Sequence, residues 1–244
     1  MRNVWIIAKR EFSSFFATPV AYVFIAIFLM LSGVFSFFIG NLYDRGQADL
    51  LPFFNFHPWL YLFLVPAIAM RTWSEERRSG SIELLMTLPI SIWEAVLGKF
   101  LAAWAVLGLA LVLTFPLWLT VNYLGNPDHG IIVAAYVGSW LMAGAFLAIS
   151  MCMSALTKNQ VVAFILAVVV CFLFVLSGSS MVVDALQPWA GNLLIDTVAS
   201  FSFLTHFEAM AKGVLALNDV GYFVLSVVIW LYASLIIIEQ KKAD

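Results

Sequence analysis

The residues of this sequence that could carry out catalysis or hold a metal ion are few and widely separated. The three histidines, His57, His129 and His206, are not spaced like the ligands of H-E-x-x-H or related metal sites. No set of Ser, His and Asp shows a nucleophile signature, so we expect each histidine to be a loop or interfacial residue. Cys152 and Cys171 lie inside apolar runs, where cysteine ordinarily acts as a small hydrophobic side chain.

The sequence also lacks an obvious means of using energy on its own. It contains no G-x-x-x-x-G-K-[ST] phosphate-binding loop, and Leu176-Ser-Gly-Ser-Ser180 only superficially resembles an ATPase signature. The middles of its apolar runs contain no Asp, Glu, Lys or Arg, which proton- and ion-coupled carriers use. The chain is therefore not expected to bind and hydrolyse ATP alone or to couple to an ion gradient, and we predict that it is not itself an enzyme.

The composition indicates that most of the chain lies in lipid. Of its 244 residues, 64% are hydrophobic and only 11% are charged, whereas soluble domains carry about 25% charged residues. The net charge of −2 gives no general attraction for nucleic acid. Six stretches approach the roughly 20 apolar residues that a transmembrane helix needs. They are 20–40, 53–70, 100–124, 131–156, 161–183 and 222–238.

The chain is thus predicted to be a single all-α integral membrane domain, 1–244, with six transmembrane helices. The second span contains Pro58 and Pro66 and is expected to bend. An even number of spans places both termini on one side, and Lys and Arg in short loops mark the cytoplasmic side. Only Arg45 and Lys212 would lie outside, so we expect cytoplasmic termini in a bacterial inner membrane. Trp73 and Trp93 are expected to be interfacial aromatic residues at the inner face.

Two further segments are predicted to be neither spans nor simple loops. Residues 1–18 have the pattern of an interfacial helix with an apolar face opposite Arg2, Lys9 and Arg10. The apolar face comprises Val4, Trp5, Ala8, Phe12, Phe15 and Phe16. As an alternative, the basic residues alone act as positive-inside anchors. Residues 184–218 mix apolar and polar residues, which predicts short amphipathic or re-entrant helices on the outer side.

The residue pattern of the most polar loop, 73–92, predicts a short apolar helix within it. Gly80 permits a turn, Glu83 would occupy the first turn of the helix, and Pro89 would end it. Leu84, Leu85 and Leu88 are costly to leave in water, so they are expected either to dock into another protein or to lie on the membrane surface.

This segment resembles the permeases of type-2 ABC exporters, and most closely those of the gliding-motility and nitrous-oxide-reductase-maturation type. The resemblance extends over most of the chain, from Lys9-Arg10-Glu11-Phe12 to Tyr222-Phe223, and the segment after Gly213 departs from the family pattern. It implies a coupling helix that docks on a separate ATPase subunit, where ATP and Mg would bind, while this chain binds no cofactor. The implied docking residues are Glu75, Glu76, Gly80, Ser81, Glu83, Leu84, Leu85, Thr87 and Pro89.

Other polar and small residues have more than one interpretation. Glu94 and Lys99 lie near the inner end of the third span, where snorkelling to the membrane surface is the favoured explanation. Small residues recur on the first and fifth spans, which allows close internal packing or, by the family resemblance, contact with a second permease. They are Ser32, Ser36 and Gly40, and Ala163, Ala167 and Cys171.

The sequence is consistent with three functions. The first is ATP-driven export through two permease copies, or one copy with a related permease, on an ATPase dimer. The second is transmission of force to an auxiliary protein outside the membrane without moving a solute, in which His206 and Glu208 are candidate contacts, although capping or packing roles are favoured for both. The third is an intramembrane enzyme. Substrate identity does not follow from one chain.

Overall fold

The computed structural model describes residues 2–82, 89–179, 182–184, 187 and 191–241, and the regular elements within these ranges are helices. The all-α prediction is confirmed. The helices are α1 (Arg2–Ala17), α2 (Val20–Val34), the π-helix η1 (Phe35–Ile39), α3 (Leu51–Asn55), α4 (His57–Ala69), α5 (Arg71–Ser79), α7 (Ile92–Val112), α8 (Phe115–Leu124), α9 (His129–Leu156), α10 (Gln160–Leu176), α12 (Asn192–Ser200), α13 (Phe203–Ala211) and α14 (Leu217–Gln240).

Among the described residues, four helical segments are long and apolar enough to cross a membrane. They are Val20–Ile39, Ile92–Leu124, His129–Leu156 and Leu217–Gln240, which correspond to the first, third, fourth and sixth predicted spans. Because a helix satisfies its own backbone hydrogen bonds, such segments are stable in lipid. The chain is therefore a multi-pass membrane protein.

The other two predicted spans form shorter helices than the sequence indicated. The stretch 53–70 is divided at Phe56 into α3 and the 13-residue α4, which accommodates Pro66 in its interior. The stretch 161–183 gives α10, which has 17 residues and ends at Leu176. Both α4 and α10 pack against α9 and against each other. Six full-length spans were predicted, whereas the helices of spanning length and apolarity among the described residues number four.

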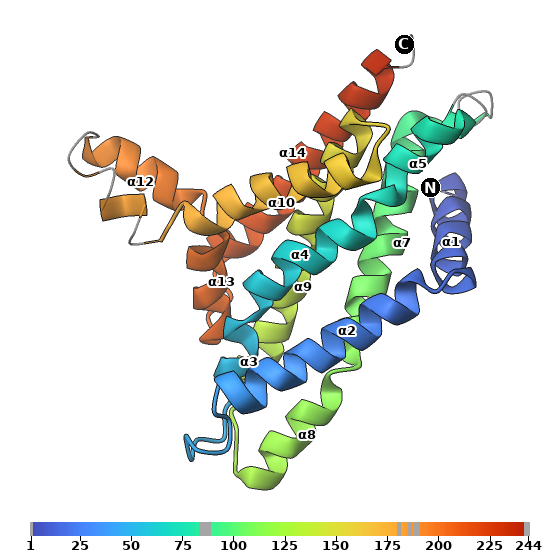
Figure 1. Cartoon of the computed structure of the whole chain (residues 1–244). Coiled ribbons are helices and arrows are strands. Elements are labelled where there is room, and N and C mark those ends of the chain that lie inside the picture. The colour runs from blue at the N-terminus through green and yellow to red at the C-terminus, as the bar shows by residue number, and fades with distance from the viewer. Residues whose placement is uncertain (1, 83–88, 180–181, 185–186, 188–190, 242–244) are drawn as a thin grey trace.

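Helix α9 is the centre of the bundle, with contacts to α4, α5, α7, α10, α13 and α14 (Figure 1). Its second half is almost entirely buried and contains several small side chains, four Ala and two Ser among them. Small side chains let neighbouring helices approach closely, which is the main source of packing energy between helices in lipid. Near its middle, Trp140 stacks on Trp104 of α7 with ring centroids 4.0 Å apart. Each of these indole N–H groups donates to the other residue's backbone carbonyl.

Helix α1 packs along α7 instead of lying alone at a membrane surface. Ile7 and Ala8 are buried, and a Cβ added to Gly98 of α7 would come within 2.7 Å of Ile7 Cγ2. Asn3 donates a hydrogen bond to Glu94, which also completes a capping box at the start of α7. The helix predicted over 1–18 is present. However, its buried face includes Ile7, which the predicted apolar stripe omitted, and Trp5 of that stripe is 71% exposed.

Hydrogen bonds gather several helix termini at one end of the bundle, which we call the α5 end. Arg77 of α5 donates to the Ala155 carbonyl and Lys241 to the Leu156 carbonyl, so α5 and the end of α14 meet the end of α9. The contact between α1 and the start of α7 lies at the same end, because Lys99 joins both to α5. Both ends of the described chain thus lie at the α5 end (Figure 1).

Candidate functional site

The junction between α4 and α5 is held by one serine of the central helix. The hydroxyl of Ser154 accepts hydrogen bonds from the backbone N–H groups of Trp73 and Ser74, each at 3.1 Å. It also donates to the carbonyl of Met70 at 2.8 Å. Backbone groups freed where one helix ends and another begins need partners when they are buried. Ser154 supplies them, and it thereby fixes α5 on α9.

The far end of α5 is fixed by charge and by a glycine. Arg77 Nη1 lies 2.8 Å from the carbonyl oxygen of Ala155, close to the C-terminus of α9, where a cation is favoured. Helix α5 ends at Gly80, whose φ of +73° is in the left-handed region that glycine adopts without strain. The predicted turn at Gly80 is therefore confirmed.

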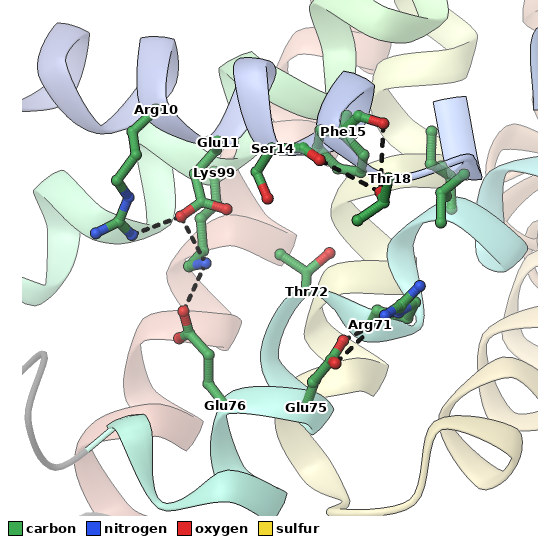
Figure 2. A pocket seen from close by; sticks show the side chains of 12 residues that line it. Arg10, Glu11, Ser14, Phe15, Thr18, Arg71, Thr72, Glu75, Glu76 and Lys99 are labelled. Atoms are coloured by element: carbon green, nitrogen blue, oxygen red, sulfur yellow. Dashed lines mark hydrogen bonds and ion pairs between the residues drawn. The ribbon is translucent and has the colours of Figure 1, made fainter. Parts of the chain in front are cut away.

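A buried lysine joins three helices at the same level. Lys99 of α7 is 4% exposed, and its Nζ lies 3.2 Å from Glu11 Oε1 on α1 and 2.8 Å from Glu76 Oε1 on α5 (Figure 2). The expectation that Lys99 snorkels to the membrane surface is wrong, because two carboxylates from other helices compensate its charge inside the protein. We call Glu11, Glu76 and Lys99 the ion triad.

Trp73 contributes to the burial of this lysine. The indole ring lies 5.4 Å from Lys99 Nζ, and Trp73 is fully buried. A cation over an indole face is stabilised electrostatically, and more strongly when water is excluded. The position of Trp73 at the inner face stays a prediction, and within the chain its side chain is buried in the bundle instead of facing outward.

Within the triad, the carboxyl group of Glu11 remains ionised at neutral pH. Burial by itself raises the pKa of this carboxyl group, but the charge of Lys99, the hydrogen bonds from Arg10 and Lys99, and the charge of Arg10 outweigh it. The pKa of Glu11 consequently lies below its ordinary value. A carboxylate with a lowered pKa stabilises the fold above its ordinary pKa, and this stabilisation is lost as the pH falls through the lowered value.

The structure divides the predicted docking residues into three groups. Glu75 is exposed and pairs with Arg71 at 2.9 Å, and Gly80 and Pro89 are exposed as well. Ser81 is partly exposed and hydrogen-bonds to Ser79, whereas the carboxylate of Glu76 is engaged in the ion triad. The remaining predicted residues lie outside the described part of the chain. They are Glu83, Leu84, Leu85 and Thr87.

The small residues predicted at a dimer interface pack inside the chain. Ser32, Ser36, Ala163, Ala167 and Cys171 are buried, and a Cβ added to Gly40 would lie 2.7 Å from Pro52 Cβ. The alternative of internal packing therefore describes these side chains within a single copy. A second copy would meet the opposite, exposed faces of α2 and α10, so contact with a second permease stays a prediction.

The segment 184–218 contains the predicted short helices, α12 and α13. Both ring nitrogens of His206 on α13 have partners within the chain. Nδ1 lies 2.6 Å from Asp219 and Nε2 lies 3.0 Å from the Ser200 carbonyl oxygen, and the ring stacks on Tyr222. Glu208 is exposed and lies 3.8 Å from Lys212. Of the two residues, Glu208 is the one with a side chain available to an outer partner.

A buried polar cluster was missed by the sequence analysis. His57 Nδ1 lies 2.7 Å from Ser139 Oγ, which is also 2.8 Å from the Tyr61 hydroxyl. His57 is fully buried among aromatic rings, so the expectation of a loop or interfacial position is wrong for this histidine. A serine beside a histidine is the start of a nucleophilic site, but neither residue lines a described cavity and both are inaccessible to solvent. The cluster pairs His57 Nδ1 and the Tyr61 hydroxyl with Ser139 Oγ, whereas His57 Nε2 is buried without a hydrogen-bond partner among the described residues.

A comparison with known protein families bears on this arrangement. The family model for "ABC-2 family transporter protein" matches residues 5–238. No curated protein sequence matches the chain at a significant level. The likeness to the gliding-motility and nitrous-oxide-reductase-maturation permeases stays a prediction. Since the family match extends from α1 to the last turn of α14, across helices that cross a membrane, the chain belongs to the ABC-2 family of transporter proteins, the transmembrane subunits of ABC transporters.

Proposed function

We propose that this chain couples ATP hydrolysis by a separate nucleotide-binding subunit to export across a bacterial inner membrane. The observation that carries the proposal is the attachment of α5. This helix forms the first part of the predicted docking segment 73–92, and Ser154, Arg77 and Lys99 bind it to α9 and α7. A push on α5 is thereby delivered to two membrane helices as a rigid-body displacement.

The proposal places the α5 end in the cytoplasm. The basic residues near this end outnumber those at the opposite end, where Arg45 and Lys212 lie, and an excess of Lys and Arg in short loops marks the cytoplasmic side. The residues are Arg2, Lys9, Arg10, Arg71, Arg77, Arg78, Lys99, Lys158 and Lys241, and Lys242, which is also basic, lies outside the described residues. If α3 together with α4 forms one membrane crossing beside α9, and α10 forms another, the chain would cross the membrane six times.

ATP and Mg would be bound by the partner subunits, and two permeases would sit on an ATPase dimer. The docking contact would involve Glu75 on the exposed side of α5 and the residues that follow this helix, Gly80 and Ser81, together with Leu84 and Leu85. Apolar side chains inserted into a pocket of a partner are typical anchors of an interface.

A substitution of Leu85 tests the docking contact. Leu85→Asp places a charge where an apolar anchor is required, so the nucleotide-binding subunit should no longer co-purify while the permease still inserts into the membrane. The matched control is Leu217→Asp, because Leu217 is 89% exposed in the first turn of α14, at the end opposite α5. Normal co-purification of the Leu85→Asp protein, at the level of the control, would contradict the proposal.

Force transmission to a protein outside the membrane is a second candidate function. It is favoured by the firm attachment of α13, in which Phe203 is fully buried. At the start of this helix, Ser202 lies so close to Gly178 that a Cβ added to the glycine would come within 2.5 Å of the Ser202 side chain. An outer platform of this kind would move with α14. The same co-purification discriminates the two functions, since a co-eluting outer protein, with no solute that stimulates ATP hydrolysis, favours transmission of force. An intramembrane enzyme would instead require activity of the purified single chain.

A further inference from the structure

A cavity of about 500 Å³ lies beside the ion triad, between α1 and α5 (Figure 2). This volume falls within the range of small-molecule sites, roughly 300–1,000 Å³. Figure 2 shows Ser14 of α1, and Thr18 just after this helix, across the cavity from Thr72 and Glu75 of α5. The cavity is thus lined from two sides by groups that can donate or accept hydrogen bonds.

The charges that line this cavity balance. Arg10, Arg71 and Lys99 carry positive charge, and Glu11, Glu75 and Glu76 carry negative charge. A ligand of only one sign gains no net attraction from such a lining, whereas a ligand that carries both signs can be complementary to it. Arg71 binds Glu75 through Nε and Nη2, and a guanidinium has further N–H donors suited to a phosphate.

The opposite part of the lining is apolar and lies at the ends of membrane helices. Phe15, Val20 and Ile68 line the cavity, and Val20 begins the first membrane helix. Lys99 lies near the start of the membrane segment Ile92–Leu124. The cavity is therefore at the depth where membrane helices emerge and lipid headgroups lie, with its charged groups next to an apolar wall.

We propose that this cavity binds the headgroup of an amphiphile that carries both a phosphate and a primary ammonium, as in phosphatidylethanolamine. The phosphate would lie against the guanidinium of Arg71 and the hydroxyl groups, and the ammonium would donate to Glu75. The acyl chains would leave along Phe15 and Ile68. This site does not depend on docking of an ATPase, so its failure would leave the proposed function standing.

The test is lipid binding by the purified full-length permease. Delipidated protein is equilibrated with vesicles that contain equal amounts of phosphatidylethanolamine, phosphatidylcholine and phosphatidylglycerol, and the retained lipid is measured by native mass spectrometry. Phosphatidylcholine keeps the phosphate but its quaternary ammonium has no N–H donor, and phosphatidylglycerol has no ammonium. We expect phosphatidylethanolamine to be retained at least several-fold over both, and equal retention of the three lipids would overturn the proposal.

Two further comparisons locate the binding. Glu75→Gln should abolish the preference, whereas Glu208→Gln, in a matched i,i+4 pair with Lys212 at the opposite end of the bundle, should leave it unchanged. A preference that survives Glu75→Gln in a folded, monodisperse protein would refute the site. Soluble phosphoethanolamine should displace the bound lipid, and equal displacement by inorganic phosphate would show that the ammonium is not recognised.

Discussion

The two ends of the helix bundle are held together by different interactions. At the α5 end, α1, α5 and α7 are joined by full charges, with Lys99 only 4% exposed between two carboxylates. At the opposite end, α13 is joined to α14 by aromatic stacking and by His206, which lies 2.6 Å from Asp219. The first set of contacts joins residues far apart in the sequence, whereas the second joins residues of neighbouring helices.

This difference bears on how each end can move. The cost of separating buried charges is high, so the helices of the α5 end should move together or not at all. At the other end α13 also packs on the central helix, where Phe203 meets Phe146 and Met210 lies against Gly138, so a single contact between α13 and α14 can be lost without freeing α13 from α9. The comparison therefore predicts that a single substitution at the α5 end has a larger and more widespread effect than one at the α13 end.

The largest effect is expected from Lys99→Met. This substitution leaves Glu11 and Glu76, whose side chains are only 19% and 20% exposed, without their shared partner. Breaking a buried ion pair from one side costs about 3–5 kcal/mol of unfolding free energy. The measurement is denaturant or thermal unfolding of the purified protein in detergent, followed by tryptophan fluorescence.

The control for Lys99→Met is Lys212→Met, at the other end of the bundle. Lys212 lies 3.8 Å from Glu208, and both side chains are more than 60% exposed, at 65% and 63%. An exposed pair of this kind contributes about 1 kcal/mol or less. If the two variants lose equal stability, the α5 end is not held by its charges.

A smaller loss is expected from Ser154→Ala. The substitution leaves the N–H groups of Trp73 and Ser74 without their hydroxyl partner, and a buried group left unsatisfied costs about 1–3 kcal/mol. Ser36→Ala is the matched control, since Ser36 is also buried but its hydroxyl donates to the Ser32 carbonyl of its own helix. Proteolysis of the chain near α5 reports the outcome, and equal cleavage rates in the two variants would show that Ser154 does not fix this helix.

The same contrast explains how much the sequence could predict. The all-α fold, the four long spans, the α1 helix and the turn at Gly80 follow from local patterns of apolar residues, glycine and proline, and each was found. Span length was harder to predict at α3 and α4, because apolar composition does not show where a helix divides. Hydropathy also cannot distinguish a membrane-facing residue from a buried one.

The candidate site was predicted less completely than the fold. Lys99 was assigned to the membrane surface because its partners, Glu11 and Glu76, become neighbours only after α1 folds back on α7. His57 was misplaced for the same reason, since Ser139 comes from a different helix. The sequence nevertheless contained a signal that these residues have partners, because charged and polar side chains in or near membrane helices are energetically costly unless they are paired.

The smallest effect is expected from Asp219→Asn, which keeps the shape of the side chain but removes its charge beside His206. The loss should be about 1 kcal/mol, the usual net value of one hydrogen bond. Hydrogen exchange should quicken in α13 and leave α5 unchanged, and Glu208→Gln on the exposed side of the same helix should alter neither. If hydrogen exchange in α5 also quickens in the Asp219→Asn protein, the two ends of the bundle are coupled through α9 and α14. The outer helices would then be part of the moving assembly instead of a separately held platform.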